Sequence, residues 1–356
     1  MKNCCCDIIV PIYNAYDETI KCIESVIKNT VEPYRLILIN DKSSDTRIEE
    51  WLEGLATEGS SNIVIMNNDF NLGFVKTVNK GIRYSRNDVV ILNSDTLVTE
   101  GWLGKLKDCA YSNDNIATVT PLTNNGSICS VPRMGETNAI PKGFTLQEYG
   151  LIVEKISFRK YPSIPTGVGF CIFIKRRILD ILGVFDEDCF NKGYGEEVDF
   201  CLKASENGFI NVLCDDTFVY HKGGMSFKNL RDKYLRDNAK ILDKRYPYYL
   251  PMVSRFTKQN PLKDIQKNIE LYIKLKNNKR NILHVLSRDM NSTYESNAIL
   301  KLPRALNENS SFNNFLFYSN GQELMVTAYI DSEVLNFRFD IGEEITYTTF
   351  HSRRYA

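Results

Sequence analysis

The chain has 356 residues, of which 43% are hydrophobic and 25% are charged, as in an ordinary globular protein, so fibrous and disordered classes are excluded. The length suggests about two domains. Lys plus Arg and Asp plus Glu both number 44, which argues against a dedicated nucleic-acid binder, because such a protein is usually basic. No apolar run reaches the roughly 18 residues that a membrane span needs.

Strand and helix patterns alternate along the first 120 residues. Short apolar runs predict strands over residues 7–14, 35–41, 62–68, 88–95 and 116–123. Apolar residues at helical spacing predict helices over residues 17–30, 46–55, 73–85 and 102–112. Together they predict an α/β fold with a parallel sheet that helices cover on both faces.

Polar residues gather where the predicted strands end. In open parallel sheets, ligands bind beyond the carboxyl ends of the strands. We therefore expect a ligand crevice formed by the following strand-end residues: Tyr13, Asn14, Asn40, Asp41, Asn67, Asn68 and Asn93 to Asp95.

The rest of the chain is less regular at first, with turn signals between residues 124 and 165. Apolar patterning returns over 166–186, a helix is predicted over 196–208, and a strand over 211–221. Residues 228–280 read as basic helices, with 15 basic and 5 acidic residues. A further strand is predicted over 279–287, followed by a small αβ segment.

The cysteines and the chain start indicate a reducing compartment. Residues 1–14 enter a strand pattern at once and show no signal-peptide h-region. Of the ten cysteines, Cys4 to Cys6 are consecutive, which suits neither paired disulfides nor a metal-binding spacing. We interpret five others as buried thiols and expect a cytoplasmic protein; they are Cys22, Cys109, Cys171, Cys201 and Cys214.

Several motif classes are absent from the sequence. No G-x-G-x-x-G follows the first strand, which disfavours dinucleotide redox chemistry, and no P-loop or G-x-S-x-G elbow occurs. With three histidines in all, a histidine-rich zinc site is disfavoured. The chemistry must therefore come from other polar groups.

Three segments carry such groups. Asn93-Ser94-Asp95 ends a strand and offers one carboxylate to Mg²⁺ or Mn²⁺, although the same triplet is also a common turn. Glu196, Glu197 and Asp199 open a predicted helix, where they either compensate the helix dipole or supply a general base. His221 ends a strand before two glycines and is either a metal ligand or a structural histidine.

In chain order, these segments resemble the inverting family-2 glycosyltransferases of the GT-A fold, whose sheet is mostly parallel and flanked by helices. The resemblance covers about residues 5–227. It rests on V-P-I-Y-N at 10–14, N-D-K-S-S-D at 40–45, N-x-G-F and N-K-G within 71–81, N-S-D at 93–95, T-G-V-G-F at 166–170, G-V-F-D-E at 183–187, G-E-E-V-D-F-C-L-K at 195–203 and H-K-G-G-M-S-F at 221–227.

The resemblance implies a role for each matching residue. The nucleotide pocket would comprise Pro11, Tyr13, Asn14 and Asp41, with the nucleotide–sugar floor shaped by Asn71, Gly73, Lys76 and Asn79 and with Asn93 and Ser94 nearby. Asp95 and His221 would hold the metal, and Glu197 would be the general base, with Asp199 and Glu196 as the other candidates. The sequence departs from the family where Asn93 replaces an Asp, where Glu197 replaces an Asp, and where the 40–45 loop lacks its usual Gly.

The implied function is inverting transfer of a sugar from a UDP- or dTDP-sugar, with Mn²⁺ or Mg²⁺, to a hydroxyl of a glycan or lipid-linked glycan in bacterial surface polysaccharide synthesis. The basic residues 228–280 would allow contact with the inner face of the membrane, or form an ordinary solvated surface. The alternatives are a nucleotide-sugar or glycan-binding domain that has lost catalysis and, with less support, a sugar-nucleotide pyrophosphorylase.

We expect three parts in the chain: a GT-A domain at 1–227, a helical linker at 228–280 and a C-terminal αβ segment at 281–356. The R-N-I-L-H-V-L-S run at 280–287 looks like the opening strand of a GT-B glycosyltransferase domain. The sequence would then be the N-terminal part of a longer bifunctional enzyme.

Overall fold

The computed structural model describes residues 5–57, 61–190, 193–223, 228–276, 280–285, 312–319, 323–330 and 333–340. The chain divides into two compact units, Met1–Ile269 and Glu270–Ala356. The first unit contains the segments on which the family-2 resemblance rests, whereas the 280–287 run belongs to the second unit. The three-part division at residues 227 and 280 stays a prediction.

The first unit alternates strands and helices. Its strands are β1 (Cys6–Ile12), β2 (Tyr34–Asn40), β3 (Ile63–Asn67), β4 (Asp88–Leu92), β5 (Thr96–Val98), β6 (Ile116–Leu122), β7 (Ser163–Ile164), β8 (Cys171–Ile174) and β9 (Ile210–His221). Its helices are α1 (Tyr16–Asn29), α2 (Thr46–Thr57), α3 (Phe74–Tyr84), α4 (Trp102–Tyr111), α5 (Leu146–Ile156), α6 (Arg176–Leu182), α7 (Glu196–Glu206), α8 (Lys228–Arg245) and α9 (Tyr249–Gln259), and α10 (Lys263–Leu275) spans the division between the units.

Among the described residues, these nine strands form one sheet in the order β3-β2-β1-β4-β8-β6-β9-β5, with β7 beside β9. The pairs β1–β2, β2–β3, β1–β4 and β6–β9 are parallel, which confirms the predicted mostly parallel sheet. Strand β8 runs antiparallel to both β4 and β6. Its apolar run gave no indication of direction, because a buried strand has the same pattern either way.

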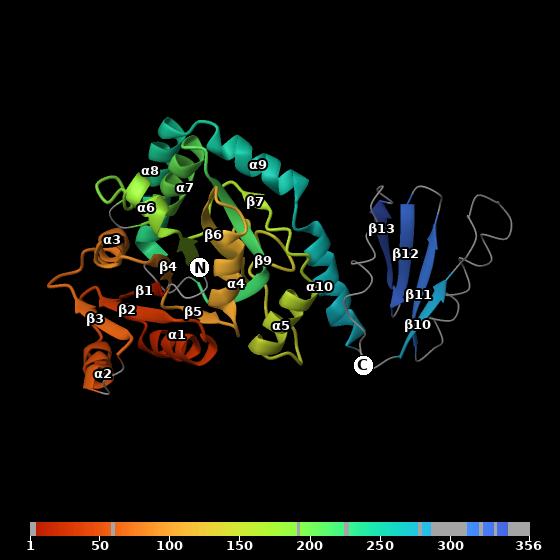
Figure 1. Ribbon diagram of the computed structural model, residues 1–356, viewed down its shortest axis with the longest axis horizontal. Coiled ribbons are helices and arrows are strands. Elements are labelled where there is room, and N and C mark those ends of the chain that lie inside the picture. Colours follow the sequence, from red (N-terminus) through yellow and green to blue (C-terminus); the bar gives the residue numbers. More distant parts are fainter. Residues whose placement is uncertain are drawn as a thin grey trace. The chain divides into compact units, whose positions relative to one another are not determined.

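Helices cover both faces of this sheet (Figure 1). Ile9, Ile37 and Ile91 pack into a core with buried residues of α3, α6 and α7. Ile8 and Leu36 are equally buried but point to the opposite face, because side chains alternate along a strand, and α1 and α4 lie on that face. Burial on both sides explains why the strands read as continuous apolar runs.

Two local differences from the sequence prediction have clear physical causes. The strand predicted over 88–95 ends at Leu92, because Asn93 to Asp95 form a turn in which Thr96 N–H donates to Asn93 O at 3.3 Å. Helix α5 was not predicted. Its start carries a capping box, in which the Thr145 hydroxyl accepts from Glu148 N–H and the Glu148 carboxylate accepts from Thr145 N–H.

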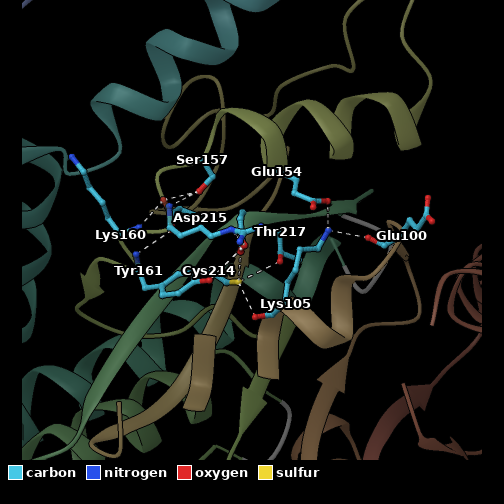
Figure 2. Close-up of polar contacts among 11 residues, drawn as sticks. Glu100, Lys105, Glu154, Ser157, Lys160, Tyr161, Cys214, Asp215 and Thr217 are labelled. Atoms are coloured by element: carbon cyan, nitrogen blue, oxygen red, sulfur yellow. Dashed lines mark hydrogen bonds and ion pairs between the residues drawn. The ribbon is translucent and has the colours of Figure 1, made fainter. Parts of the chain in front are cut away.

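Strand β9 carries a bulge that anchors the loop after α5. Its pairing with β6 jumps from Pro121–Cys214 to Leu122–Phe218. Figure 2 shows that Asp215, on this bulge, accepts hydrogen bonds from the Ser157 hydroxyl at 3.0 Å and from Tyr161 N–H at 3.1 Å. These contacts fix β9 upstream of its last residue, His221.

The cysteines behave as the sequence analysis expected where the structure describes them; Cys4 lies outside the described residues. Cys22, Cys109, Cys171, Cys201 and Cys214 are buried free thiols. Burial raises the pKa of Cys22 and Cys201 to about 12, so these thiols stay protonated at neutral pH. They pack as small apolar side chains.

The second unit is described for four strands: β10 (Arg280–Val285), β11 (Phe312–Ser319), β12 (Glu323–Ile330) and β13 (Glu333–Asp340). They form a sheet in that order, with β10 and β11 parallel and the other pairs antiparallel. Of the strand predicted over 279–287, residues 279, 286 and 287 lie outside the described residues. The suggestion that this unit opens a GT-B domain stays a prediction.

Helix α3 approaches the sheet closely at one glycine, which generates a stability prediction. A β-carbon at Gly81 would lie 2.7 Å from Ile9 Cγ2 and 3.0 Å from Ile39 Cδ1. We expect Gly81→Ala to lower the free energy of unfolding by about 1–3 kcal/mol, the usual effect of overpacking a core. Urea denaturation measures this.

Gly54, inside helix α2, is the matched control, because a β-carbon there meets nothing within 4 Å. Gly54→Ala should stabilise the protein by about 0.5–1 kcal/mol through reduced backbone entropy of the unfolded chain. Equal effects of the two substitutions would contradict the close approach of α3.

Candidate active site

The candidate site lies where β1, β2 and β4 end on one edge of the sheet. Because these strands are parallel neighbours, the residues that follow them come together, as predicted for Asn14, Asp41 and Asn93. Pro11 is tolerated near the end of β1 because the pairing of β1 with β4 stops at Ile9, so no ladder bond to β4 is lost.

Asp41 organises the loop that follows β3. It is buried, and its carboxylate accepts hydrogen bonds from Asn68 Nδ2 at 2.8 Å, Leu72 N–H at 2.8 Å and Gly73 N–H at 2.9 Å. These bonds are internal to the protein, so Asp41 shapes the loop. A direct contact of Asp41 with a base or ribose stays a prediction.

Asn14 also acts within the protein. It adopts a left-handed φ of 56°, and its Oδ1 accepts from Ser44 N–H at 2.9 Å and Asp45 N–H at 3.1 Å. It thereby ties the end of β1 to the loop after β2. Tyr13, directly before it, is half-buried at the same edge.

The predicted nucleotide–sugar floor lies at the start of α3. Asn71 and Lys76 are half-buried, and Gly73 adopts a φ of 85° just before the helix. Asn79 is fully buried instead. Its Nδ2 donates to Phe185 O at 2.9 Å and to Glu187 Oε2 at 2.7 Å, which fastens α3 to the loop after α6.

Asp95 and His221 meet across the pairing of β5 with β9. Asp95 Oδ1 lies 3.5 Å from His221 Nε2, and the two side chains are only 15% and 18% exposed. Asp95 also accepts from Gly223 N–H at Oδ2, at 3.2 Å, and from Lys222 N–H at its carbonyl, at 3.0 Å. The structure thus brings together the two residues predicted to hold a metal.

The surroundings of His221 fix the orientation of its ring. His221 Nδ1 lies 3.0 Å from Asn125 O, and because a carbonyl only accepts, Nδ1 carries the proton. When the ring is neutral, Nε2 presents its lone pair toward Asp95. Asn124 holds the His221 backbone on both sides, and the ring stacks on Phe170 with centroids 5.3 Å apart.

This arrangement fits a hard divalent cation with few protein ligands. Two neighbouring ligands of an ion at about 2.1 Å lie roughly 3 Å apart in octahedral geometry, close to the observed 3.5 Å. Asn93 Oδ1, on the same turn, is buried and has no hydrogen-bond partner within the described part of the chain, and Ser94 is half-buried. Among the described residues no group of three or more His, Cys, Asp or Glu side chains could hold a metal, so further ligands would come from phosphate and water.

Glu196 and Glu197 are the first two residues of helix α7. The Oε2 atoms of both are buried and have no hydrogen-bond partner among the described residues. Burial raises the pKa of Glu196 well above its usual range, with the neighbouring Glu197 charge adding to this, and burial also raises the pKa of Glu197. Both carboxyls therefore keep their protons to a higher pH than an ordinary glutamate does.

Glu197 lies next to the metal-binding candidates through one short segment. A β-carbon at Gly169 would be 3.5 Å from Glu197 Cδ, so the carboxyl packs against this glycine. The next residue, Phe170, accepts from Asn93 N–H at 2.9 Å and stacks on His221. The T-G-V-G-F segment therefore contacts Glu197 through Gly169 and His221 through Phe170, so it lies between the base candidate and the metal-ligand candidate.

Asp199 lies elsewhere. Its carboxylate is buried and accepts from Arg245 Nη1 at 2.7 Å and from the Tyr246 hydroxyl at 3.1 Å, both near the end of α8. The pair with Arg245 is an internal ion pair, which supports a structural role for Asp199. Asp199 is thus engaged in an ion pair, whereas Glu197 packs against Gly169.

Sequence reasoning missed several residues at the site. Lys222 forms an ion pair with Glu18, and this hydrogen bond lowers the pKa of Glu18. Asn124 orients His221. Tyr249, at the start of α9, lies near Glu197; burial raises the pKa of the Tyr249 hydroxyl, and the charge of Glu197 contributes to this rise. These partners lie far apart in the chain, so no spacing motif could have indicated them.

Comparison with known proteins agrees with this geometry. The model of glycosyl transferase family 2 matches residues 7–183, and this part of the chain belongs to that family. A curated relative from Haemophilus influenzae (strain ATCC 51907 / DSM 11121 / KW20 / Rd), described as an uncharacterized glycosyltransferase, is 30% identical over 121 residues. That match covers 33% of this chain and 37% of the relative, so it spans little more than a third of the relative's length.

Solved structures show the same fold. The mannosyltransferase PcManGT from Pyrobaculum calidifontis, in complex with GDP-Man and Mn²⁺, superposes with a TM-score of 0.51 and 15% identity, over 85% of this chain and 79% of that one. GalNAc-T7 with UDP, GalNAc and Mn²⁺ superposes with a TM-score of 0.50 and 16% identity, over 75% of this chain and 55% of that one. At these identities the likeness establishes the GT-A fold.

The raised pKa of Glu196 generates a prediction about stability and pH. The folded state holds this proton more tightly than the unfolded chain, so the stability that Glu196 contributes falls as the pH rises above about 4.3, the ordinary glutamate pKa. Glutamine does not ionise. We therefore expect Glu196→Gln to match the parent protein in melting temperature near pH 4 and to exceed it increasingly toward pH 8.

Glu50→Gln is the matched control, because Glu50 is an exposed residue on α2. The difference in melting temperature between Glu50→Gln and the parent should stay constant with pH. A constant difference for Glu196→Gln as well would show that Glu196 ionises normally in the folded protein.

Proposed function

We propose that the protein is an inverting, divalent-metal-assisted glycosyltransferase that moves a sugar from a nucleoside diphosphate to an acceptor hydroxyl. One observation carries the proposal: Asp95 Oδ1 and His221 Nε2 face each other at 3.5 Å, beside a segment that packs against Glu197. The site thus joins a place for a cation with a carboxylate suited to accept a proton. The family of residues 7–183 supports the same conclusion.

The donor is proposed to be a UDP- or dTDP-sugar. The structural neighbours carry nucleotides with Mn²⁺, namely UDP in GalNAc-T7 and GDP-Man in PcManGT, which supports a nucleotide donor here. The loop shaped by Asp41 and the start of α3 would form the nucleotide pocket, with Tyr13 and Lys76 at its edge. A half-buried lysine at a helix start suits a phosphate-bearing ligand.

The metal would be Mn²⁺ or Mg²⁺, held by Asp95 and His221. When bound, such an ion neutralises the charge that develops on the leaving diphosphate. The protein's own contribution is to orient the His221 ring. Asn125 accepts from Nδ1, and Phe170 supports the ring face.

Glu197 is proposed as the general base. Its carboxylate takes the proton of the acceptor hydroxyl as that oxygen attacks the sugar carbon, and the bond to the diphosphate breaks on the opposite face. Burial places the pKa of Glu197 above that of an ordinary glutamate, which brings it nearer to neutral pH, where a base is most effective. Activity should therefore fall as the pH drops through this raised pKa.

The acceptor is proposed to be a glycan or lipid-linked glycan of a bacterial surface polysaccharide, with the enzyme in the cytoplasm at the inner face of the membrane. Exposed cations on the helical extension support this, among them Lys240, Lys244, Lys258 and Lys263. Leu250, on the same extension, is 62% exposed. Anionic lipid attracts such cations at about 1 kcal/mol each. No helix in the described ranges combines the length and apolarity needed to cross a bilayer.

The second candidate function is a nucleotide-sugar-binding domain without catalysis. The Asn93 and Glu197 replacements favour it, because each changes a position that the family fills with Asp. Donor hydrolysis in the presence of Mn²⁺ separates the two. Release of nucleoside diphosphate from a panel of nucleotide sugars supports an enzyme, whereas saturable binding with no release from any member contradicts it.

The base assignment is tested by Glu197→Gln, with Asp199→Asn as the matched variant on the same helix. Removing a general base typically slows turnover by about 10²–10⁴-fold. We expect that loss for Glu197→Gln with donor affinity retained, because shape is preserved. Asp199→Asn should mainly lower the melting temperature, because it weakens the pair with Arg245. Normal turnover by Glu197→Gln, with a folded but inactive Asp199→Asn, would assign the base to Asp199.

The metal assignment is tested by binding of nucleoside diphosphate with and without Mn²⁺. Asp95→Ala should abolish the enhancement of affinity by Mn²⁺ without unfolding the protein. His221→Ala should reduce it less, because water and phosphate can fill one coordination position. Calorimetry measures both. If Mn²⁺ enhances the affinity of Asp95→Ala as much as that of the parent protein, Asp95 is not a metal ligand.

A further inference from the structure

The position of the two glutamates depends on the backbone before them. The Oε2 atom of each glutamate has no hydrogen-bond partner among the described residues. The hydrogen bonds that the two carboxyls accept from the backbone come from the start of α7 itself, including Gly195, so their place follows that of the backbone there. The three preceding residues, Gly193, Tyr194 and Gly195, all have positive φ, at 98°, 71° and 137°. For Tyr194 this conformation costs about 1 kcal/mol or more and persists only where the surrounding structure imposes it.

Helix α8 supplies that constraint through one side chain. Asn238 Nδ2 donates to Gly193 O at 2.8 Å and to Tyr194 O at 3.0 Å. Asn238 is only 8% exposed, so these bonds are shielded from water. One amide group therefore grips two consecutive carbonyls of the segment with positive φ.

Further contacts of α8 lie on the same helix face, at i+4, i+7 and i+8 from Asn238. A β-carbon at Gly195 would lie 3.3 Å from Leu242 Cδ1, so Leu242 closes over the last residue before α7. Arg245 and Tyr246 then bind Asp199 in the first turn of α7. Helix α8 thus contacts the glutamate-bearing segment on both sides of Glu197.

We propose that Asn238 is a positioning residue for the general base: by holding the carbonyls of Gly193 and Tyr194 it sets the place of the Glu197 carboxylate. This inference rests on the proposed function. Asn238 touches neither glutamate side chain and acts through the backbone. Helix α8, in the basic segment 228–280, would then be part of the catalytic domain, in addition to the proposed contact of that segment with the membrane.

The effect of losing Asn238 follows from this geometry. Without the two hydrogen bonds, the segment relaxes and Glu197 shifts from its place against Gly169. A displacement of about 1 Å from a remote change can slow turnover by about 10²-fold. Water would also reach the carboxyl more readily, so its raised pKa would fall toward the ordinary value. The acid limb of the pH–rate profile would then move to lower pH.

The test compares Asn238→Leu, which keeps the branched shape and the number of side-chain heavy atoms but removes both N–H donors, with Asp243→Asn as a control. Asp243 is an exposed residue on α8. Full-length proteins are assayed for kcat, donor KM and the pH–rate profile with Mn²⁺, and for amide exchange of residues 193–197. We expect Asn238→Leu to lose about 10²-fold in kcat with donor KM within about twofold, to shift the acid limb to lower pH and to exchange faster.

The outcomes separate the hypotheses. A purely structural role would lower the melting temperature and leave kcat per folded molecule and the pH profile unchanged, and that result would overturn the proposal. If Asn238→Leu does not fold, Asn238→Ser, which keeps a small polar group, is judged by the same criteria. A parent protein that transfers no sugar contradicts the proposed function and this inference together, whereas an active parent with a normal Asn238 variant contradicts only the inference.

Discussion

The candidate site depends on the pairing of β5 with β9. This short antiparallel pairing sets Thr96 opposite His221, so the residue before Thr96, Asp95, meets the histidine ring. Lys222 N–H and Gly223 N–H then both donate to Asp95. Two strand ends that are remote in the sequence thus meet in one corner, the candidate cation site, and backbone hydrogen bonds hold it.

The remaining polar groups at the crevice are placed in the same way. The side chains of Asp41 and Asn79 form hydrogen bonds within the protein, to the start of α3 and to the loop after α6, so they position the segments around the candidate site. Glu196 and Glu197 differ, because the Oε2 atom of each is buried without a hydrogen-bond partner among the described residues. Burial of a carboxyl is costly and raises its pKa, and such a cost is usually found where a group is needed for chemistry.

The sequence was sufficient to predict the mostly parallel sheet and most of its helices, because these follow from local apolar periodicity. It also indicated Asp95, His221 and Glu197, because each belongs to a short motif. It could not show that Asp199 pairs with Arg245 or that Asn238 holds Gly193, since these contacts join segments more than 40 residues apart. The sequence likewise did not determine the antiparallel direction of β8. Because both faces of this strand are buried, its sequence is a continuous apolar run, which is the same for either direction.

The turn at Asn93 to Asp95 confirms one of the two interpretations of this triplet and is compatible with the other. Thr96 N–H closes the turn on Asn93 O, and that same turn presents the Asp95 carboxylate to His221. The helix start at Glu196 is similar, since a carboxylate there meets the helix dipole and also faces the site. In both cases the local structure is what positions the reactive group.

The most direct test of the account is a crystal structure of the protein with Mn²⁺ and a nucleoside diphosphate, with the ion located by its anomalous scattering. The account predicts one ion bound by Asp95 and His221 Nε2 and by the diphosphate, with Glu197 facing the space beyond the phosphate. An ion bound away from both residues, or a nucleotide seated outside the crevice at the ends of β1, β2 and β4, would contradict it.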